Sequence, residues 1–187
     1  MQFTLYYRGE LKSGNSATPR HKHDLRRHFH RQMSALWREI PLSNFRGFLD
    51  DPAAPAAINL LSRKNGFTFA PLVSEKFGLV AELDLQLLWP QTPGAIITSG
   101  GDLDNRLKTL FDALKLPSEP TALPKDACPS EDETPFFCLL EDDSLITRVT
   151  VETDRLLDPA VTSSEVALFL RVRTRQVQVK HGTIGLP

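Results

Sequence analysis

The sequence predicts an α+β fold in a single domain, with a mixed β-sheet of about five strands and two main helices. Three observations lead to this prediction. Two segments repeat apolar residues at helical spacing, and five others are short and apolar or alternate apolar with polar residues. A length of 187 residues with 41% hydrophobic and 24% charged residues is typical of a globular domain, whereas each half alone would be near the size where a core becomes marginal.

The first strand is expected at 3–7, where Phe, Thr, Leu and Tyr follow one another. From 23 to 39, apolar residues recur at steps of three and four, which predicts an amphipathic helix. Its outer face is expected to be basic and to carry Arg26, Arg27, Arg31 and Arg38. Strands are expected next at 66–70 and 79–88, and the second of these alternates leucine and alanine with polar residues, so that one face is buried.

A second helix is predicted to begin near Asp102 and to end near Lys115, with Leu103, Leu107 and Leu110 on its apolar stripe. The last strands are expected at 144–153 and 166–172. Between them and the helix lies a proline-rich, acidic segment, placed at about 116–139 and interpreted as a loop or mobile insert.

The net charge of the whole chain is -1, which does not by itself indicate a nucleic-acid-binding protein. The distribution is uneven, however, because residues 1–46 contain nine Lys/Arg and only three acids. Neither a signal peptide nor a membrane span is evident, so a cytoplasmic protein without a membrane partner is expected. In a reducing compartment, Cys128 and Cys138 are expected to be free thiols rather than a disulfide.

Acidic residues and one lysine suggest a metal site. Asp102 and Asp104 flank a leucine, so in an extended segment their side chains point the same way. Lys108 follows one helical turn later, and the pair Asp142 and Asp143 precedes a predicted strand. Two or three carboxylates suffice for Mg²⁺, which could activate water and neutralise a phosphate, while Lys108 could stabilise phosphate charge.

Simpler explanations exist for each of these residues. Asp102 or Asp104 could cap the helix N-terminus. Asp104 and Lys108 could form an ordinary surface ion pair, and Asp142 and Asp143 could be solvated turn residues.

A longer pattern resembles the RusA family of Holliday-junction resolvases. That family shows a D-[LIV]-D-N-x-x-K motif, then D-A-L, then D-D before a strand. The matching segments are Asp102-Leu103-Asp104-Asn105-Arg106-Leu107-Lys108, Phe111-Asp112-Ala113-Leu114 and Leu140-Glu141-Asp142-Asp143-Ser144-Leu145-Ile146. The loop at 11–15 is similar to the family's Ser-x-Asn loop after the first strand, and the order of strands and helices agrees along most of the chain.

The resemblance implies a RusA-like fold and a homodimer that nicks two strands of branched DNA, with Mg²⁺ or Mn²⁺ as cofactor, in DNA recombination and repair. It implies that Asp102, Asp104 and Asp143 bind the metal and that Lys108 is the catalytic-site lysine. Asp142 is the alternative to Asp143 as the third ligand. Lys12 and Asn15 are expected to contact DNA. Three departures are visible: Thr98-Ser99-Gly100-Gly101 in place of a basic run, a longer acidic insert, and a longer connection after the first helix.

The basic helix face suggests a further contact surface. Arg26, Arg27 and Arg31 are expected to bind either DNA phosphates or the acidic insert, which could also cover the site as a lid. Two alternatives to an active nuclease remain. One is a RusA-like domain that binds nucleic acid or protein without cutting, and the other is an enzyme acting on a nucleotide or sugar nucleotide.

Overall fold

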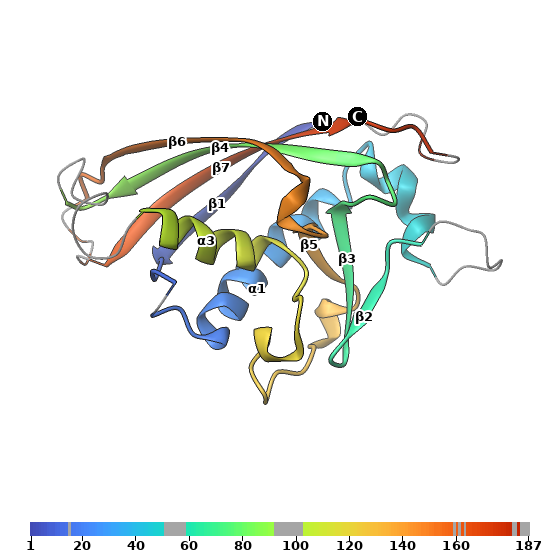
Figure 1. Cartoon of the computed structure of the whole chain (residues 1–187), viewed down its shortest axis with the longest axis horizontal. Helices are drawn as coiled ribbons and strands as arrows, with labels where there is room; N and C mark the ends of the chain where they lie inside the picture. Colours follow the sequence, from blue (N-terminus) through green and yellow to red (C-terminus); the bar gives the residue numbers. More distant parts are fainter. Residues whose placement is uncertain are drawn as a thin grey trace.

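The computed structural model of the chain describes residues 1–14, 16–50, 59–91, 103–158, 160, 162, 164–180 and 183. The fold is α+β, as the sequence predicts, and these residues form seven strands in two mixed sheets together with two α-helices (Figure 1). The prediction of one sheet of about five strands therefore underestimates the β-structure.

The larger sheet contains four strands in the order β1-β7-β4-β6. Their bounds are Gln2–Glu10 for β1, Glu165–Gln176 for β7, Leu79–Trp89 for β4 and Ile146–Arg155 for β6. β1 and β4 are antiparallel to β7, whereas β4 and β6 are parallel. The predicted alternation in β4 is confirmed, since Leu83, Leu85 and Leu87 are buried and Gln86 is exposed. One face of this sheet therefore faces the core and the other faces outward.

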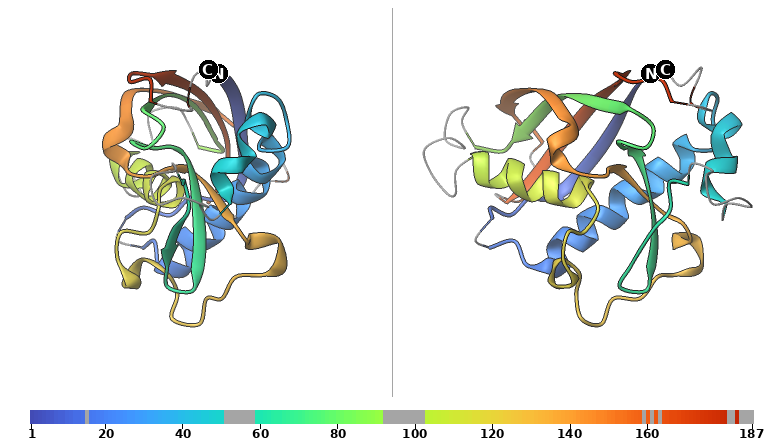
Figure 2. Two further views of the ribbon diagram at one scale, coloured as in Figure 1. Left: turned by 90° about the vertical axis from the view of Figure 1, so that its right-hand side faces the viewer. Right: turned by 45° about the vertical axis from the view of Figure 1, so that its right-hand side comes forward.

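Two α-helices, α1 (Pro19–Leu36) and α3 (Leu103–Leu114), cover the inner face of the larger sheet. Figures 1 and 2 show both on the same side of it. α1 begins before the predicted residue 23 because Thr18 caps it, accepting a hydrogen bond from the His21 N–H, and because Pro19 suits the first turn. Buried side chains of both helices, such as Phe29 and Leu110, share one core with the sheet.

The smaller sheet has the order β2-β3-β5, with β2 (Ser62–Lys64) antiparallel and β5 (Phe136–Leu140) parallel to β3 (Phe67–Val73). Asn65 and Gly66 join β2 to β3, and their φ angles of 49° and 82° are those of a tight hairpin turn. β5 begins inside the segment predicted to be an insert and ends one residue beyond it. All five of its residues are buried, so the sequence shows no alternation that would identify a strand.

The acidic segment before β5 is packed against α1 and the smaller sheet. It contains two 3-10 turns, η2 (Pro120–Ala122) and η3 (Glu131–Glu133). Leu116 and Leu123 join a second hydrophobic cluster with side chains of the smaller sheet. Arg20 and Arg27 of α1 bind Asp126 and Glu133 at 2.6 and 2.7 Å. This segment is therefore a packed strap rather than a mobile loop.

Two further 3-10 segments complete the described elements, η1 (Leu42–Leu49) after α1 and η4 (Asp143–Leu145) directly before β6. Within the described ranges, no helix has both the length and the apolar character needed to cross a membrane.

Candidate functional site

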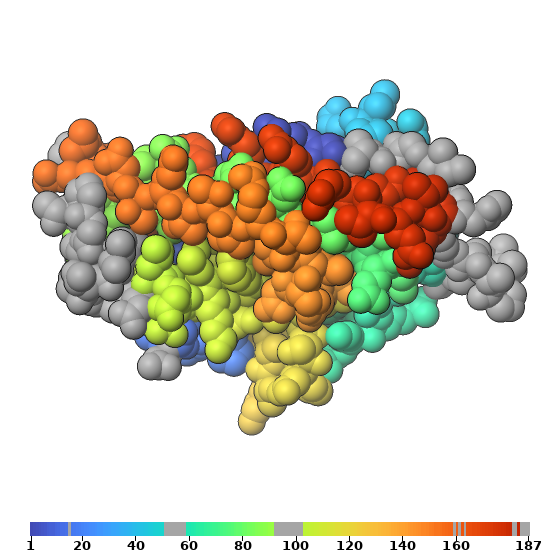
Figure 3. All heavy atoms as spheres, turned by 45° about the horizontal axis from the view of Figure 1, so that its top comes forward, coloured from blue at the N-terminus to red at the C-terminus, as the bar shows by residue number. Residues whose placement is uncertain are grey.

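Two candidate site residues of the D-x-D-N-x-x-K motif lie on the exposed side of α3. Asp104 and Lys108 are both exposed, while Leu110, Ala113 and Leu114 on the opposite side are buried. The space-filling view shows α3 open at the surface beside β6 (Figure 3). Among the described residues, neither Asp104 nor Lys108 forms an ion pair or a side-chain hydrogen bond, so the surface-pair explanation is not realised. An exposed carboxylate and an exposed ammonium thus lie one turn apart.

The loop after β1 lies against the first turn of α3. Arg106 donates a hydrogen bond from Nη1 to the Leu11 carbonyl. A methyl group added to Gly14 would lie 3.4 Å from Oδ1 of Asn105, so the loop backbone passes within contact distance of the helix. The fold therefore brings Lys12 to the same end of α3 as Asp104. The proposed DNA contact Asn15 and the proposed ligand Asp102 lie outside the described residues.

Asp143 lies at the other end of α3. Its Oδ2 accepts a hydrogen bond from Lys115 Nζ at 2.7 Å, and that ammonium is also 3.7 Å from Asp112. Asp112 is eight residues after Asp104, or about 12 Å along the helix axis. Oxygens bound to one Mg²⁺ are at most about 4 Å apart, because each lies about 2.1 Å from the ion. Asp104 therefore lies toward the N-terminal end of α3 and Asp143 beside its C-terminal end, and the expectation that they share a cation stays a prediction.

Asp142 caps η4, and its role as a ligand in place of Asp143 stays a prediction. Its side chain accepts a hydrogen bond from the Ser144 N–H, and the side chain and N–H of Ser144 together lower the pKa of the Asp142 carboxyl below its usual range. Within the part of the chain that the structure describes, no three His, Cys, Asp or Glu side chains form a metal-binding group. Asp102 lies outside that part.

A row of ion pairs, which the sequence analysis did not identify, joins α1, α3 and η4. Lys22 Nζ lies 2.7 Å from the carboxylate of Asp112. The ammonium of Lys115 lies near both this carboxylate and that of Asp143, so it links the two. Although burial disfavours the charged form of Lys115, its hydrogen bond to Asp143 raises the pKa of this ammonium above the ordinary value. The helical spacing of Asp104, Lys108 and Asp112 was visible in the sequence, but nothing there indicated that Lys22 and Asp143 would be the partners at one end of it.

The basic face of α1 differs from the prediction at one residue. Arg26 is 2% exposed and donates to the main-chain carbonyls of Asp112 and Lys115 at the C-terminus of α3, so it is not available to DNA phosphates. Arg27 binds Glu133 of the acidic strap, which was one of the two predicted partners. Arg31 is exposed on the same helix. Of the predicted DNA contacts, Arg31 is thus an exposed described side chain, whereas the ammonium of Lys12 lies 3.4 Å from Glu10.

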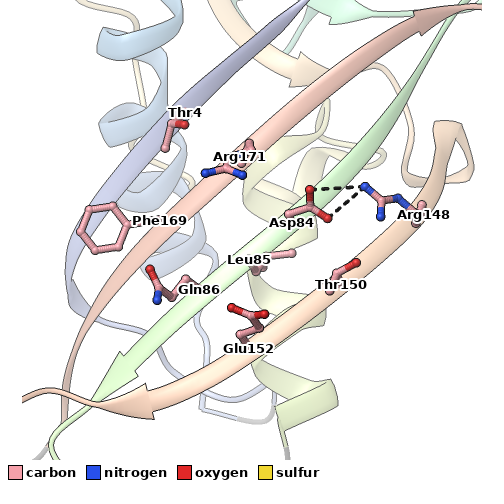
Figure 4. Close-up of a pocket in the computed structure, with 9 residues that line it drawn as sticks. All are labelled: Thr4, Asp84, Leu85, Gln86, Arg148, Thr150, Glu152, Phe169 and Arg171. Atoms are coloured by element: carbon pink, nitrogen blue, oxygen red, sulfur yellow. Dashed lines mark hydrogen bonds and ion pairs between the residues drawn. The ribbon is translucent and has the colours of Figure 1, made fainter.

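A hollow with a volume of about 530 Å³ lies on the outer face of the larger sheet, away from α3 (Figure 4). Arg148 binds Asp84 there at 3.1 Å, and Phe169 packs 5.1 Å from Tyr6. The remaining charged lining residues are Glu152 and Arg171. Two arginines and two carboxylates leave this hollow without an excess of either sign, so its charge does not favour a polyanion.

No family model matches the chain, and neither the curated proteins nor the solved structures contain a significant match. The resemblance to the RusA family therefore depends on the motif residues themselves.

Proposed function

We propose that this chain is a magnesium-dependent endonuclease of the RusA type, which hydrolyses phosphodiester bonds in branched DNA such as Holliday junctions. The observation that carries the proposal is that Asp104 and Lys108 are exposed one turn apart on α3 and have no ion-pair partner among the described residues. A carboxylate and an ammonium group in such an arrangement suit a hydrated cation and a phosphate, respectively.

The residues at this end of α3 fit a magnesium ion. Asp104 has no cationic partner among the described residues, in contrast to Asp143, which Lys115 neutralises. Mg²⁺ is commonly held by one or two carboxylates together with waters and substrate phosphates. Asp104 and its sequence neighbour Asp102 would hold the ion, and Mn²⁺ prefers the same oxygen ligands. When bound, the ion supplies positive charge that polarises phosphate oxygens and favours deprotonation of water.

The side chains of the chain perform the remaining tasks. Lys108 lies one turn from Asp104, so its ammonium can hold a phosphate oxygen and stabilise the negative charge that develops during hydrolysis. Lys12, on the loop after β1, would supply a second positive charge by exchanging its ion pair with Glu10, at 3.4 Å, for a phosphate. Asp143 has no part in this proposal, because it is bound to Lys115 at the far end of the helix. A homodimer, which the resemblance implies, would present two such sites and nick two strands of one junction.

Cleavage of a four-way junction, a fork and a duplex with Mg²⁺ tests the proposal. Asp104→Asn should lower kcat/KM by at least about a hundredfold, equivalent to about 2.7 kcal/mol of lost transition-state stabilisation, while leaving junction affinity in EDTA near that of wild type. Asp154→Asn, which removes an exposed carboxylate of β6, is the matched control and should cleave normally. Undiminished cleavage by Asp104→Asn would contradict the proposal.

The second candidate is a RusA-like domain that binds without cutting. Two observations favour it: Asp143 is paired with Lys115, and the outer sheet face has the balanced charge that suits a protein partner better than DNA. Junction binding without turnover in either Mg²⁺ or Mn²⁺ would support this alternative.

A further inference from the structure

We infer that Arg106 is the positioning residue of the candidate site, because it fastens the first turn of α3 to the loop after β1 and to the end of β4. Its part in cleavage rests on the proposed function, whereas its part in holding the loop does not. In the RusA motif, this residue occupies a variable position between the asparagine and the lysine, so the resemblance assigns it no role.

The first contact of Arg106 is with β4. Its guanidinium lies 4.5 Å from the ring centroid of Trp89, the last residue of that strand. Trp89 is only 6% exposed and belongs to the main hydrophobic core. Arginine stacked on a tryptophan face is a favourable pairing of a cation with the π-system. This contact therefore fixes the first turn of α3 relative to a side chain that is held in the core.

The second contact is with the loop. Arg106 Nη1 donates to the carbonyl of Leu11, whose side chain is fully buried. Lys12 follows directly, and its own N–H donates to Nε2 of His21 at 3.3 Å. The loop is thus bound at consecutive residues, once by α3 and once by α1. Loss of the Arg106 bond would leave the loop held at this point by the α1 contact alone and would free it from the helix that carries Asp104.

The helical geometry explains why this bond sets the orientation of the site. Residues two apart on an α-helix lie about 200° apart around the axis, at 3.6 residues per turn. Arg106 therefore faces the interior while Asp104 and Lys108, two residues before and after it, face outward. Fixing the guanidinium between Trp89 and Leu11 consequently fixes the rotation of the helix, and with it the direction in which the carboxylate and the ammonium point.

Lysine cannot substitute for arginine in this place. A guanidinium is planar, so it can stack on Trp89 with one face while an N–H in its plane reaches the Leu11 carbonyl, whereas an ammonium is a compact, strongly hydrated charge. Burial lowers the pKa of Arg106, but an arginine remains protonated at neutral pH.

Two variants and one control test the inference. Arg106→Met keeps the length of the apolar stem, Arg106→Lys keeps the charge, and Arg155→Met removes an exposed arginine at the end of β6. In the free protein, amide hydrogen exchange at Lys12, Ser13 and Gly14 should become at least about tenfold faster in both Arg106 variants and stay unchanged in the control. Exchange at these amides equal to that of wild type would overturn the inference.

Kinetics separate positioning from folding. In both Arg106 variants, kcat should fall by about a hundredfold, as expected for a displacement near 1 Å, while KM for the junction stays within about twofold because no binding group is lost. Millimolar methylguanidine should restore part of kcat to Arg106→Met but not to Asp104→Asn. Faster loop exchange with unchanged kcat would overturn the positioning role, whereas cleavage surviving in Asp104→Asn would refute the proposed function and leave the loop contact standing.

Discussion

Lys115 at the end of α3 holds the carboxylate of Asp143 at 2.7 Å, and the same ammonium lies 3.7 Å from Asp112. This pair ties the helix to η4, directly before β6 begins. Asp143, from the second acidic pair of the RusA-like pattern, is therefore engaged in holding two elements together, at the opposite end of α3 from Asp104.

The first prediction follows from this separation. Asp143→Asn should keep cleavage within about threefold of wild type, because Asp143 is bound by Lys115 just past the C-terminal end of α3, whereas Asp104 lies at its N-terminal end. The unfolding free energy should fall by less than about 1 kcal/mol, since Asp143 is 43% exposed. Single-turnover cleavage and urea unfolding measure the two effects. A loss of cleavage as large as that of Asp104→Asn would contradict this prediction and indicate that Asp143 binds the metal.

A second prediction concerns the strap. Glu133 is buried and paired with Arg27, so Glu133→Gln should destabilise the fold by about 2 kcal/mol at neutral pH, as for a hydrogen bond to a charged group. Burial acts to raise the pKa of Glu133, but bonds from Arg27 and the Ser130 N–H bring it below the ordinary value. This stabilisation is therefore complete above the unfolded-state pKa of about 4.3 and is lost as the pH falls through the lower folded-state value.

Urea unfolding between about pH 3 and 7 checks this expectation. The gap between wild type and Glu133→Gln should close toward acid. Asp126→Asn is the matched control, because its pair with Arg20 is exposed and should matter little. A gap that is independent of pH would show that Glu133 acts by packing and not by charge.

The third prediction concerns His23, a buried histidine of α1 whose two ring nitrogens have no hydrogen-bond partner among the residues that the structure describes. Burial, aided by Arg26 and Arg27, lowers the pKa of His23 to about 4. As the pH falls below about 6.5, the unfolded chain binds this proton before the folded chain does, so stability is full above that pH and declines toward pH 4.

His23→Phe should remove that decline, since a phenyl ring has no proton to bind. His23 already packs 5.4 Å from Phe67 and 5.9 Å from Phe136, so an aromatic replacement suits its surroundings. Between pH 7 and pH 5, the unfolding free energy of wild type should fall by about 2 kcal/mol more than that of His23→Phe. Unfolding free energies at the two pH values provide the measurement, and parallel curves for the two proteins would contradict the assignment.

A fourth prediction concerns the two cysteines, which are free thiols in the structure as the sequence analysis expects. Cys128 is exposed, whereas Cys138 is buried in β5, and burial raises the pKa of the Cys138 thiol to about 12. Iodoacetamide should alkylate one cysteine in the native protein and two in urea. Mass spectrometry of tryptic peptides identifies the modified residue, and native labelling of Cys138 would contradict the burial described.

Periodicity predicted several elements correctly. It failed where the polarity of a residue did not indicate whether that residue is buried or exposed. β4 alternates leucine with polar residues and α3 repeats leucine at helical spacing, so both were identified. β5 is buried on both faces and has no alternation, so it was assigned to the insert. Arg26 was placed on the exposed face because of its charge, although its guanidinium satisfies the carbonyls that end α3. That pairing joins two helices far apart in sequence and leaves no local signal.

By itself, the sequence determined the α+β class, the two main helices and the motif that places Asp104 and Lys108 one turn apart. Only the tertiary structure decided which acids can meet. β4 and β6 are parallel, so the chain between them must return from the end of one strand to the start of the other. α3 makes most of that return, which places Asp104 where β4 ends and Asp143 where β6 begins, and the motif's two acidic parts are thereby held at opposite ends of one helix.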